Sequence, residues 1–353
     1  MRVFSIILFL IYFSTNSLFS QSWNLIWNDE FSFNHLDSTK WIHDIGTGSQ
    51  YGLYGWGNSE LQYYQPSNTE VYNGTAKIIA KVEPNGIVDS WGNTMYYSSS
   101  KITTKGIFDF KYGKVEAKIK TIDGQGFWPA FWMLPSGGSW PCNGEIDIME
   151  QWGSDGPTNT TTGAAHVGIC PGSSFYQSFS NVISSGSYAD NFHVYSVQWQ
   201  PDYIAWYVDN VQFFQVTPSS YPSNYTWPFN SNDWYLMINL GITSSGPNSN
   251  TVFPNQIEVD YVRVYQSNVT SVSESISDIS NIIYPNPTDG KITINEKDIS
   301  SMTLLDIYGS RVLEVKTPLD NQQIDINHLS DGMYLLQYIK DDITFVNKIK
   351  LIK

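Results

Sequence analysis

The stretch Trp140-Pro141-Cys142-Asn143-Gly144-Glu145-Ile146-Asp147-Ile148-Met149-Glu150-Gln151-Trp152-Gly153 places three carboxylates within six residues, separated by apolar side chains. Its β-branched isoleucines favour a strand. Side chains alternate faces along a strand, so Glu145 and Asp147 point the same way. Strict alternation would put Glu150 in the core, where an unpaired carboxylate is costly. We therefore predict a β-bulge between Asp147 and Glu150, which returns Glu150 to the face of the other two acids and leaves the isoleucines on the opposite face.

Three clustered acids favour acid–base chemistry on a sugar. Like charges raise the pKa of one acid and leave another low. Glycoside hydrolysis uses that asymmetry, because one carboxylate attacks and one carboxylic acid protonates the leaving oxygen. Two other interpretations are open for an isolated acidic triplet, namely a Ca²⁺ site or the solvated edge of an ordinary strand. The aromatic residues around this triplet favour the catalytic interpretation.

The segment Glu145–Glu150 resembles the catalytic signature of glycoside hydrolase family 16. It has the longer form, with one extra residue before the second glutamate, that is typical of laminarinases, the endo-β-1,3-glucanases. Three further blocks resemble this family in the same order: Gly55–Tyr64, Phe127–Pro135 and Val259–Tyr265. The resemblance covers about residues 22–266 and implies an all-β jelly roll, a concanavalin-like β-sandwich of two curved antiparallel sheets. Recurrent short alternating runs and turn signals predict the same fold class without the resemblance.

The resemblance also implies roles for the three acids. Glu145 matches the nucleophile of a retaining reaction and Glu150 matches the acid/base. Asp147 lies between them and is expected to hold a hydrogen bond to the nucleophile. A flat strand would leave Glu145 and Glu150 about 13 Å apart, so their cooperation requires a concave, twisted strand.

Five residues are expected to bind substrate: Asn58, Trp128, Trp132, Trp140 and His166. Asn58 matches a family position that hydrogen-bonds sugar hydroxyls, and Trp140 and His166 match positions at the family cleft. Trp128 and Trp132 are four residues apart, so in an extended segment they share a face. Their rings are then expected to form the base of neighbouring sugar-binding subsites. Core packing is the alternative for the tryptophans. A purely structural role is the alternative for His166, and a turn role for Asn58.

A structural Ca²⁺ is implied by the resemblance alone. Its expected ligands are the backbone carbonyls of Glu30 and Gly74 and the side chain of Asp260. Carbonyl ligands leave no mark in a sequence, and Asp260 could instead pair with Arg263. The expected chemistry itself requires no cofactor.

Two departures from the family pattern leave the fine specificity open. Lys101 stands where relatives often carry an arginine that faces the substrate, so a point charge replaces a planar fork there. Residues 239–246 lack the Gly-Gly-x-Trp-Pro found in many laminarinases at this point.

The composition excludes several classes of function. The chain has 353 residues, a net charge of −14, and 15% aromatic residues. The negative charge argues against a nucleic-acid partner and disfavours sulfated or uronic polymers. A neutral polysaccharide is compatible, because aromatic faces suit the apolar faces of sugars. The sequence has no nucleophile elbow, P-loop, dinucleotide fingerprint or zinc-ligand spacing.

The two ends of the chain predict export. Residues 1–20 have one arginine, a short apolar run and small residues, as in a secretory signal peptide. In that compartment Cys142 and Cys170 either pair or stay free, and the sequence leaves both open. The catalytic domain is expected over residues 21–266, as a monomer, followed by a Ser-rich linker at 267–281.

Residues 282–353 resemble the C-terminal sorting domain of the type IX secretion pathway. Four blocks carry this resemblance: Tyr284–Gly290, Leu305–Gly309, Leu329–Leu336 and Lys348–Lys353. It implies the secretion machinery as a partner, and a secreted or outer-membrane surface location. A small carbohydrate-binding module is the alternative.

The leading functional hypothesis is an endo-acting β-1,3-glucanase. The rivals within hydrolases are a mixed-linkage β-1,3-1,4-glucanase and a galactan (agar-type) hydrolase. A transglycosylase would share every catalytic residue. A non-catalytic glucan-recognition protein is the rival from another class, and retention of all three acids argues against it.

Overall fold

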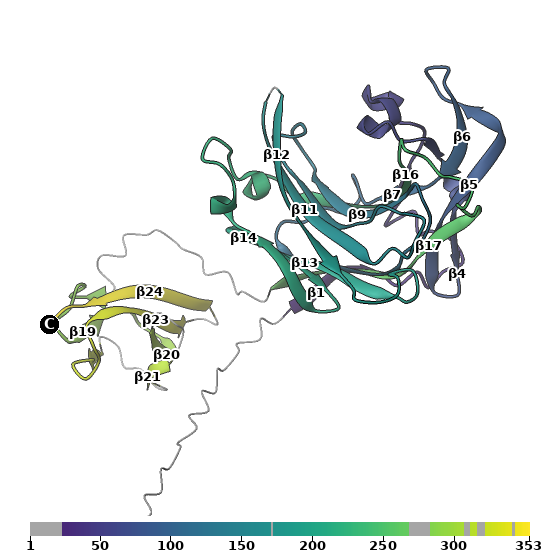
Figure 1. The fold of residues 1–353 in the computed structure, drawn as a ribbon. Helices are drawn as coiled ribbons and strands as arrows, with labels where there is room; N and C mark the ends of the chain where they lie inside the picture. Colours follow the sequence, from purple (N-terminus) through teal and green to yellow (C-terminus); the bar gives the residue numbers. More distant parts are fainter. Residues whose placement is uncertain (1–22, 171, 268–282, 307–310, 316–321, 341–342) are drawn as a thin grey trace, which may run out of the picture. The chain divides into compact units, whose positions relative to one another are not determined.

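The computed structural model describes the chain except residues 1–22, 171, 268–282, 307–310, 316–321 and 341–342 (Figure 1). The predicted signal peptide and nearly all of the predicted linker lie outside the described residues. The chain divides into two compact units, residues 1–267 and 268–353, which are described separately below.

The first unit is a sandwich of two large sheets, antiparallel apart from one parallel pairing of β3 with β6 (Figure 1). One sheet runs in the order β15-β14-β13-β8-β17-β5-β6-β3, with β1 paired to β17 and β4 to β5. Its strands are β1 (Trp23–Asp29), β3 (Gln62–Tyr64), β4 (Thr69–Tyr72), β5 (Thr75–Val88), β6 (Thr94–Ser99), β8 (Gly113–Lys120), β13 (His193–Gln200), β14 (Tyr203–Val208), β15 (Val211–Val216) and β17 (Asn255–Ser267).

The other sheet carries the acidic segment and runs in the order β12-β11-β10-β9-β16-β7-β2. Its strands are β2 (Ile42–Asp44), β7 (Lys101–Thr103), β9 (Phe127–Pro135), β10 (Glu145–Glu150), β11 (Thr160–Ile169), β12 (Ser173–Val182) and β16 (Trp234–Ile242). In the described part of this unit, five short 3₁₀ helices lie in the connections: η1 (Ser49–Tyr51), η2 (Tyr54–Gly57), η3 (Pro66–Asn68), η4 (Pro218–Ser220) and η5 (Pro228–Asn230).

The core between these sheets follows from the alternation of apolar residues. Ile146 and Ile148 of β10 are buried, as predicted, against the opposite sheet. Every residue of β16 is buried, which suits a central strand covered on both faces. The all-β jelly-roll prediction is confirmed.

The second unit has two small sheets and a core of its own. Its strands are β18 (Ile283–Tyr284), β19 (Lys291–Ile294), β20 (Ile299–Asp306), β21 (Arg311–Val315), β22 (Gln323–Asp325), β23 (Gly332–Lys340) and β24 (Ile343–Leu351). Among the described residues of both units, no helix is long and apolar enough to cross a membrane.

Candidate active site

The predicted β-bulge is present in β10. Asp147 and Glu150 are three residues apart, but their partners on β9, Trp132 and Ala130, are only two apart. The register on the β11 side shifts at the same place. The extra residue turns Glu150 back towards Glu145 and Asp147, and all three acids line one pocket.

A tryptophan of the opposite sheet supports the bulge from the core. Trp206 on β14 is fully buried, and its indole N–H donates to the backbone carbonyl of Asp147 at 2.7 Å. Gly163 on β11 leaves room for this ring, because a Cβ at that position would overlap it. The backbone at the bulge is therefore held by a hydrogen bond from outside its own sheet.

The pocket combines the acids with aromatic and polar side chains. It is lined by Trp56, Asn58, Glu60, Tyr64, Lys101, Trp128, Ala130, Trp132, Glu145, Asp147, Glu150 and Asn239. Three residues predicted to contact sugar, Asn58, Trp128 and Trp132, are among them. Flat aromatic faces beside hydrogen-bonding groups are the surfaces that carbohydrate sites use.

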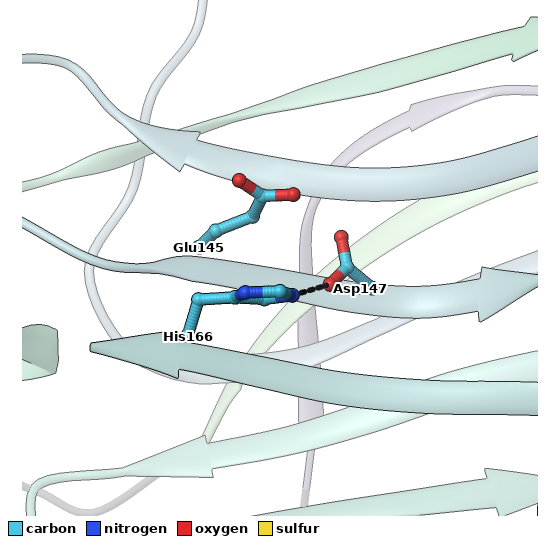
Figure 2. Close-up of side chains that lie close together, drawn as sticks. All are labelled: Glu145, Asp147 and His166. Carbon is cyan, nitrogen blue, oxygen red and sulfur yellow. Dashed lines mark ion pairs between the residues drawn. The ribbon is translucent and has the colours of Figure 1, made fainter. Parts of the chain in front are cut away.

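Each acid has its own polar partner. The indole N–H of Trp140 donates to Glu145 Oε2 at 2.6 Å, and that of Trp128 donates to Glu150 Oε1 at 3.0 Å. His166 Nε2 lies 3.0 Å from Asp147 Oδ2 (Figure 2). This last contact is an ion pair when His166 is protonated, and it is not aligned as a hydrogen bond. Trp140 and His166, also predicted from the sequence, thus contact the acids directly.

Burial and mutual repulsion raise the pKa of both glutamates. Burial, and then the charge of Asp147, raise the pKa of Glu145 to about 8, against smaller opposing effects of His166 and Trp140. The pKa of Glu150 lies well above its usual range, because of burial and then the charges of Asp147 and Glu145. Burial lowers the pKa of His166, but its contact with Asp147 outweighs this and the net pKa is raised. The two glutamates repel each other when both are ionised, so a proton on one favours ionisation of the other.

These raised pKa values predict how stability depends on pH. Glu145 has a pKa of about 8 in the folded state and an ordinary value of 4.5, so between these pH values the folded state keeps a proton that the unfolded state releases. The contribution of Glu145 to the free energy of unfolding is therefore complete below about pH 4.5 and is lost as the pH rises towards about 8. Glu145→Gln cannot ionise, so we expect its melting temperature relative to wild type to rise between pH 5 and 8, by a few degrees.

Tryptophan fluorescence can follow this change in the full chain, because all 13 tryptophans lie before residue 268. Glu70→Gln, at an exposed carboxylate on β4, is the control and should show a difference that does not grow with pH. A constant difference for Glu145→Gln as well would contradict the expectation.

Several pocket residues were not predicted as site residues. The Glu60 carboxylate accepts hydrogen bonds from Gln62 Nε2 at 2.6 Å and from the Tyr64 hydroxyl at 3.1 Å. The Tyr64 hydroxyl in turn accepts a hydrogen bond from Asn239 Nδ2. The Oδ1 atom of Asn239 accepts a hydrogen bond from the indole N–H of Trp132. The network joins β3, β16 and β9, and residue types alone carry no signal of it.

Lys101, at the position where relatives often carry an arginine that faces the substrate, is one of the residues that line the pocket. It is buried, and its ammonium lies 4.5 Å from the centre of the Trp56 ring and 4.7 Å from that of Trp132. Asp44 Oδ2 is 3.4 Å away. The charge is therefore engaged by the protein itself, between two indoles that line the pocket.

The predicted calcium ligands are the backbone carbonyls of Glu30 and Gly74 and the side chain of Asp260, and of these the Asp260 side chain has a protein partner. Arg263 holds the Glu30 carboxylate with two hydrogen bonds of 2.8 Å, and Lys118 holds Asp260. The alternative pairing of Asp260 with Arg263 is therefore wrong. The residues fit Ca²⁺ only in part, because the ammonium of Lys118 would repel a cation beside Asp260. The site, including the Gly74 carbonyl, stays a prediction.

A calcium site made by the acids of β10 fits less well. Ligand atoms of Glu145, Asp147 and His166 lie within 4.8 Å of one another. Ca²⁺ prefers oxygen ligands, and here an imidazole nitrogen occupies one position. The arrangement suits proton transfer better.

The structure answers the cysteine question left open by the sequence. Cys142 and Cys170 form a disulfide, with their Cα atoms 5.7 Å apart. It joins the β9–β10 loop to the residue that follows β11.

Comparisons with known proteins match two parts of the chain. Glycosyl hydrolases family 16 matches residues 57–263, and the secretion system C-terminal sorting domain matches residues 282–353. Glucan endo-1,3-beta-glucosidase A1 of Niallia circulans is 37% identical over 268 residues, which are 69% of this chain and 38% of that protein. Beta-glucanase of Rhodothermus marinus is 32% identical over 266 residues, which are 69% of this chain and 85% of that one.

A solved structure gives the same result for the fold. The endo-beta-1,3-glucanase from Pyrococcus furiosus has 38% sequence identity and a TM-score of 0.64, over 69% of this chain and 95% of that chain. The prediction of a C-terminal sorting domain is confirmed. The chain spans less than two thirds of the length of the Niallia relative.

Proposed function

The chain belongs to glycosyl hydrolases family 16, and from this premise we propose that it is a secreted, retaining endo-β-1,3-glucanase. The observation that carries the proposal is the pocket in which Glu145, Asp147 and Glu150 meet on one face of β10, beside Trp128 and Trp132. The similarity to endo-1,3-β-glucanases supports the choice of linkage.

The proposed mechanism assigns the first proton transfer to Glu150. Its raised pKa favours the protonated form, and Trp128 orients its carboxyl group. Glu150 protonates the leaving sugar oxygen while Glu145 attacks the anomeric carbon and forms a glycosyl ester. Glu150, now a base, then activates the water that cleaves this ester.

Glu145 must be ionised to attack, although its pKa is raised in the free protein. A proton on Glu150 removes one negative charge from its surroundings and lowers the cost of ionising it. Trp140 and His166 act in the same direction, the first by its hydrogen bond and the second by its positive charge when protonated. Asp147, paired with His166, is proposed to orient and modulate the nucleophile.

The proposed location follows from the sorting domain. This domain supports export by a type IX pathway to the cell surface or the medium, with the secretion machinery as partner. A monomer is proposed, and the substrate is a neutral β-glucan, in keeping with the negative charge of the chain.

Release of reducing sugar from four polysaccharides tests the proposal. We expect the full-length protein to degrade laminarin, to act more weakly on lichenan, and to leave agarose and carboxymethylcellulose intact. Glu145→Gln should lose the laminarin activity. Preference for lichenan would indicate a mixed-linkage enzyme, and activity on agarose a galactan hydrolase. Tight binding to laminarin without turnover would overturn the enzymatic assignment, and transfer to added oligosaccharide acceptors would indicate a transglycosylase.

A further inference from the structure

The loop that joins β9 to β10, residues 136–144, brings a side chain onto the proposed nucleophile. Trp140 lies in this loop, and its indole N–H donates to Glu145 Oε2. Trp140 is itself 57% exposed. Little packing therefore holds the ring in place, and its hydrogen bond depends on where the loop backbone places it.

The 136–144 loop is attached to neighbouring strands near both of its ends. At its start, Ser136 N–H donates to the carbonyl of Asp233, which precedes β16. Near its other end, the disulfide ties Cys142 to Cys170, beside β11. The hydrogen bonds from Asn143 to Ser139 and from Gly144 to Pro141 lie within the loop, so they shape it without attaching it to the sheet.

The surface of β11 accommodates the tied loop. Gly168 lies under Pro141, and a Cβ at position 168 would overlap both the ring and the backbone of that proline. The next residue but one is Cys170, so the close approach and the disulfide occur at the same end of β11. His166, which pairs with Asp147, lies on the same strand two residues before Gly168. One strand therefore supports both the loop and a partner of the acids.

We propose that the Cys142–Cys170 disulfide positions the nucleophile, by holding the 136–144 loop on β11 so that Trp140 donates its hydrogen bond to Glu145. The inference rests on the proposed function, because it takes Glu145 as the nucleophile. The cysteines do not touch substrate and act through Trp140, so they are positioning residues.

The charges around Glu145 determine what loss of this hydrogen bond does. Asp147 and Glu150 on its own strand oppose its ionisation. Lys101 on β7 and His166 on β11, when protonated, favour it, while Tyr235 on β16 is neutral near pH 7 because burial raises its pKa. The Trp140 N–H adds a donor that stabilises the carboxylate form. Without this donor, ionisation of Glu145 requires a higher pH.

A double-mutant cycle in the full chain tests the proposal. Its members are wild type, Trp140→Phe, Cys142→Ser/Cys170→Ser, and the triple variant, assayed as kcat/KM on laminarin against pH. One hydrogen bond to a charged group corresponds to about tenfold, so Trp140→Phe and the cysteine variant should each lose about that factor. The acidic limb of each profile should move up by about one pH unit. The triple variant should be no worse than Trp140→Phe alone, because the disulfide acts through that side chain.

Trp91→Phe is the matched control, because it also removes an exposed indole, in the turn between β5 and β6. Its pH profile should equal that of wild type. Additive losses in the triple variant, or a cysteine variant with the wild-type acidic limb, would overturn the proposal. Should the cysteine variant not fold, reduction of folded wild type and of folded Trp140→Phe by dithiothreitol provides the same comparison.

Different experimental results would contradict the proposed function and the proposed role of the disulfide. A wild-type protein without turnover would contradict the function alone. In that case the titration of the Glu145 carboxyl carbon by ¹³C NMR replaces the assay, since it needs no substrate. The inference then requires a higher Glu145 pKa in Trp140→Phe and in the cysteine variant than in wild type, and an unchanged pKa would overturn it.

Discussion

Glu145→Ala and Glu150→Ala are each expected to lose almost all activity on laminarin, and azide should rescue them to opposite products. Removal of a nucleophile lowers kcat by about 10⁴–10⁶ and removal of a general acid by about 10²–10⁴. With an aryl β-glucoside that has a good leaving group, Glu145→Ala leaves space for azide on the nucleophile's side. Direct displacement there gives the α-glycosyl azide.

The Glu150→Ala variant keeps the nucleophile, so the same aryl substrate still forms the glycosyl ester. Azide then attacks from the side of the missing acid/base, and the second inversion gives the β-glycosyl azide. The anomeric proton coupling in ¹H NMR distinguishes the two products. Glu70→Ala, which removes an exposed carboxylate on β4, should keep wild-type activity without azide. The same anomer from both active-site variants would rule out the assigned roles.

The β-bulge in β10 could be predicted from the sequence because burying a charged side chain is costly. The spacing of Asp147 and Glu150 required a bulge, because the alternative placed a carboxylate in the core. Alternation also identified Ile146 as a core residue, and the structure has it fully buried. These inferences need only neighbours along one strand, and a strand's period is visible in a single sequence.

The rest depends on contacts between distant strands, which a single sequence does not encode locally. Trp206 reaches the Asp147 carbonyl across 59 positions, and Lys101 meets Trp56 and Trp132 only after β7, β16 and β9 are assembled. The disulfide stayed open for the same reason, since pairing depends on a separation in space. From its residue type alone, a tryptophan is expected to be buried and a lysine exposed, and neither expectation identifies the partner of the side chain.

Trp206→Phe is expected to damage stability and activity together, because this side chain holds the backbone at the bulge. The substitution removes the donor to the Asp147 carbonyl and leaves a gap where the indole was. Both effects fall on a fully buried site, so we expect a loss of about 2–4 kcal/mol in the free energy of unfolding. A carbonyl released at the bulge lets Glu150 turn away from Glu145, and a displacement of about 1 Å in a catalytic group costs about 10²-fold in kcat.

Trp199→Phe separates the role at the bulge from simple packing. Trp199 on β13 is also fully buried, but its indole nitrogen has no hydrogen-bond partner among the described residues. Its substitution should lower stability by about 1–2 kcal/mol through lost packing and leave kcat on laminarin unchanged. Urea unfolding followed by tryptophan fluorescence, together with kcat for both variants, makes the comparison. Equal kcat values would mean that strand pairing alone holds the bulge, and that the hydrogen bond from the opposite sheet contributes to stability without directing Glu150.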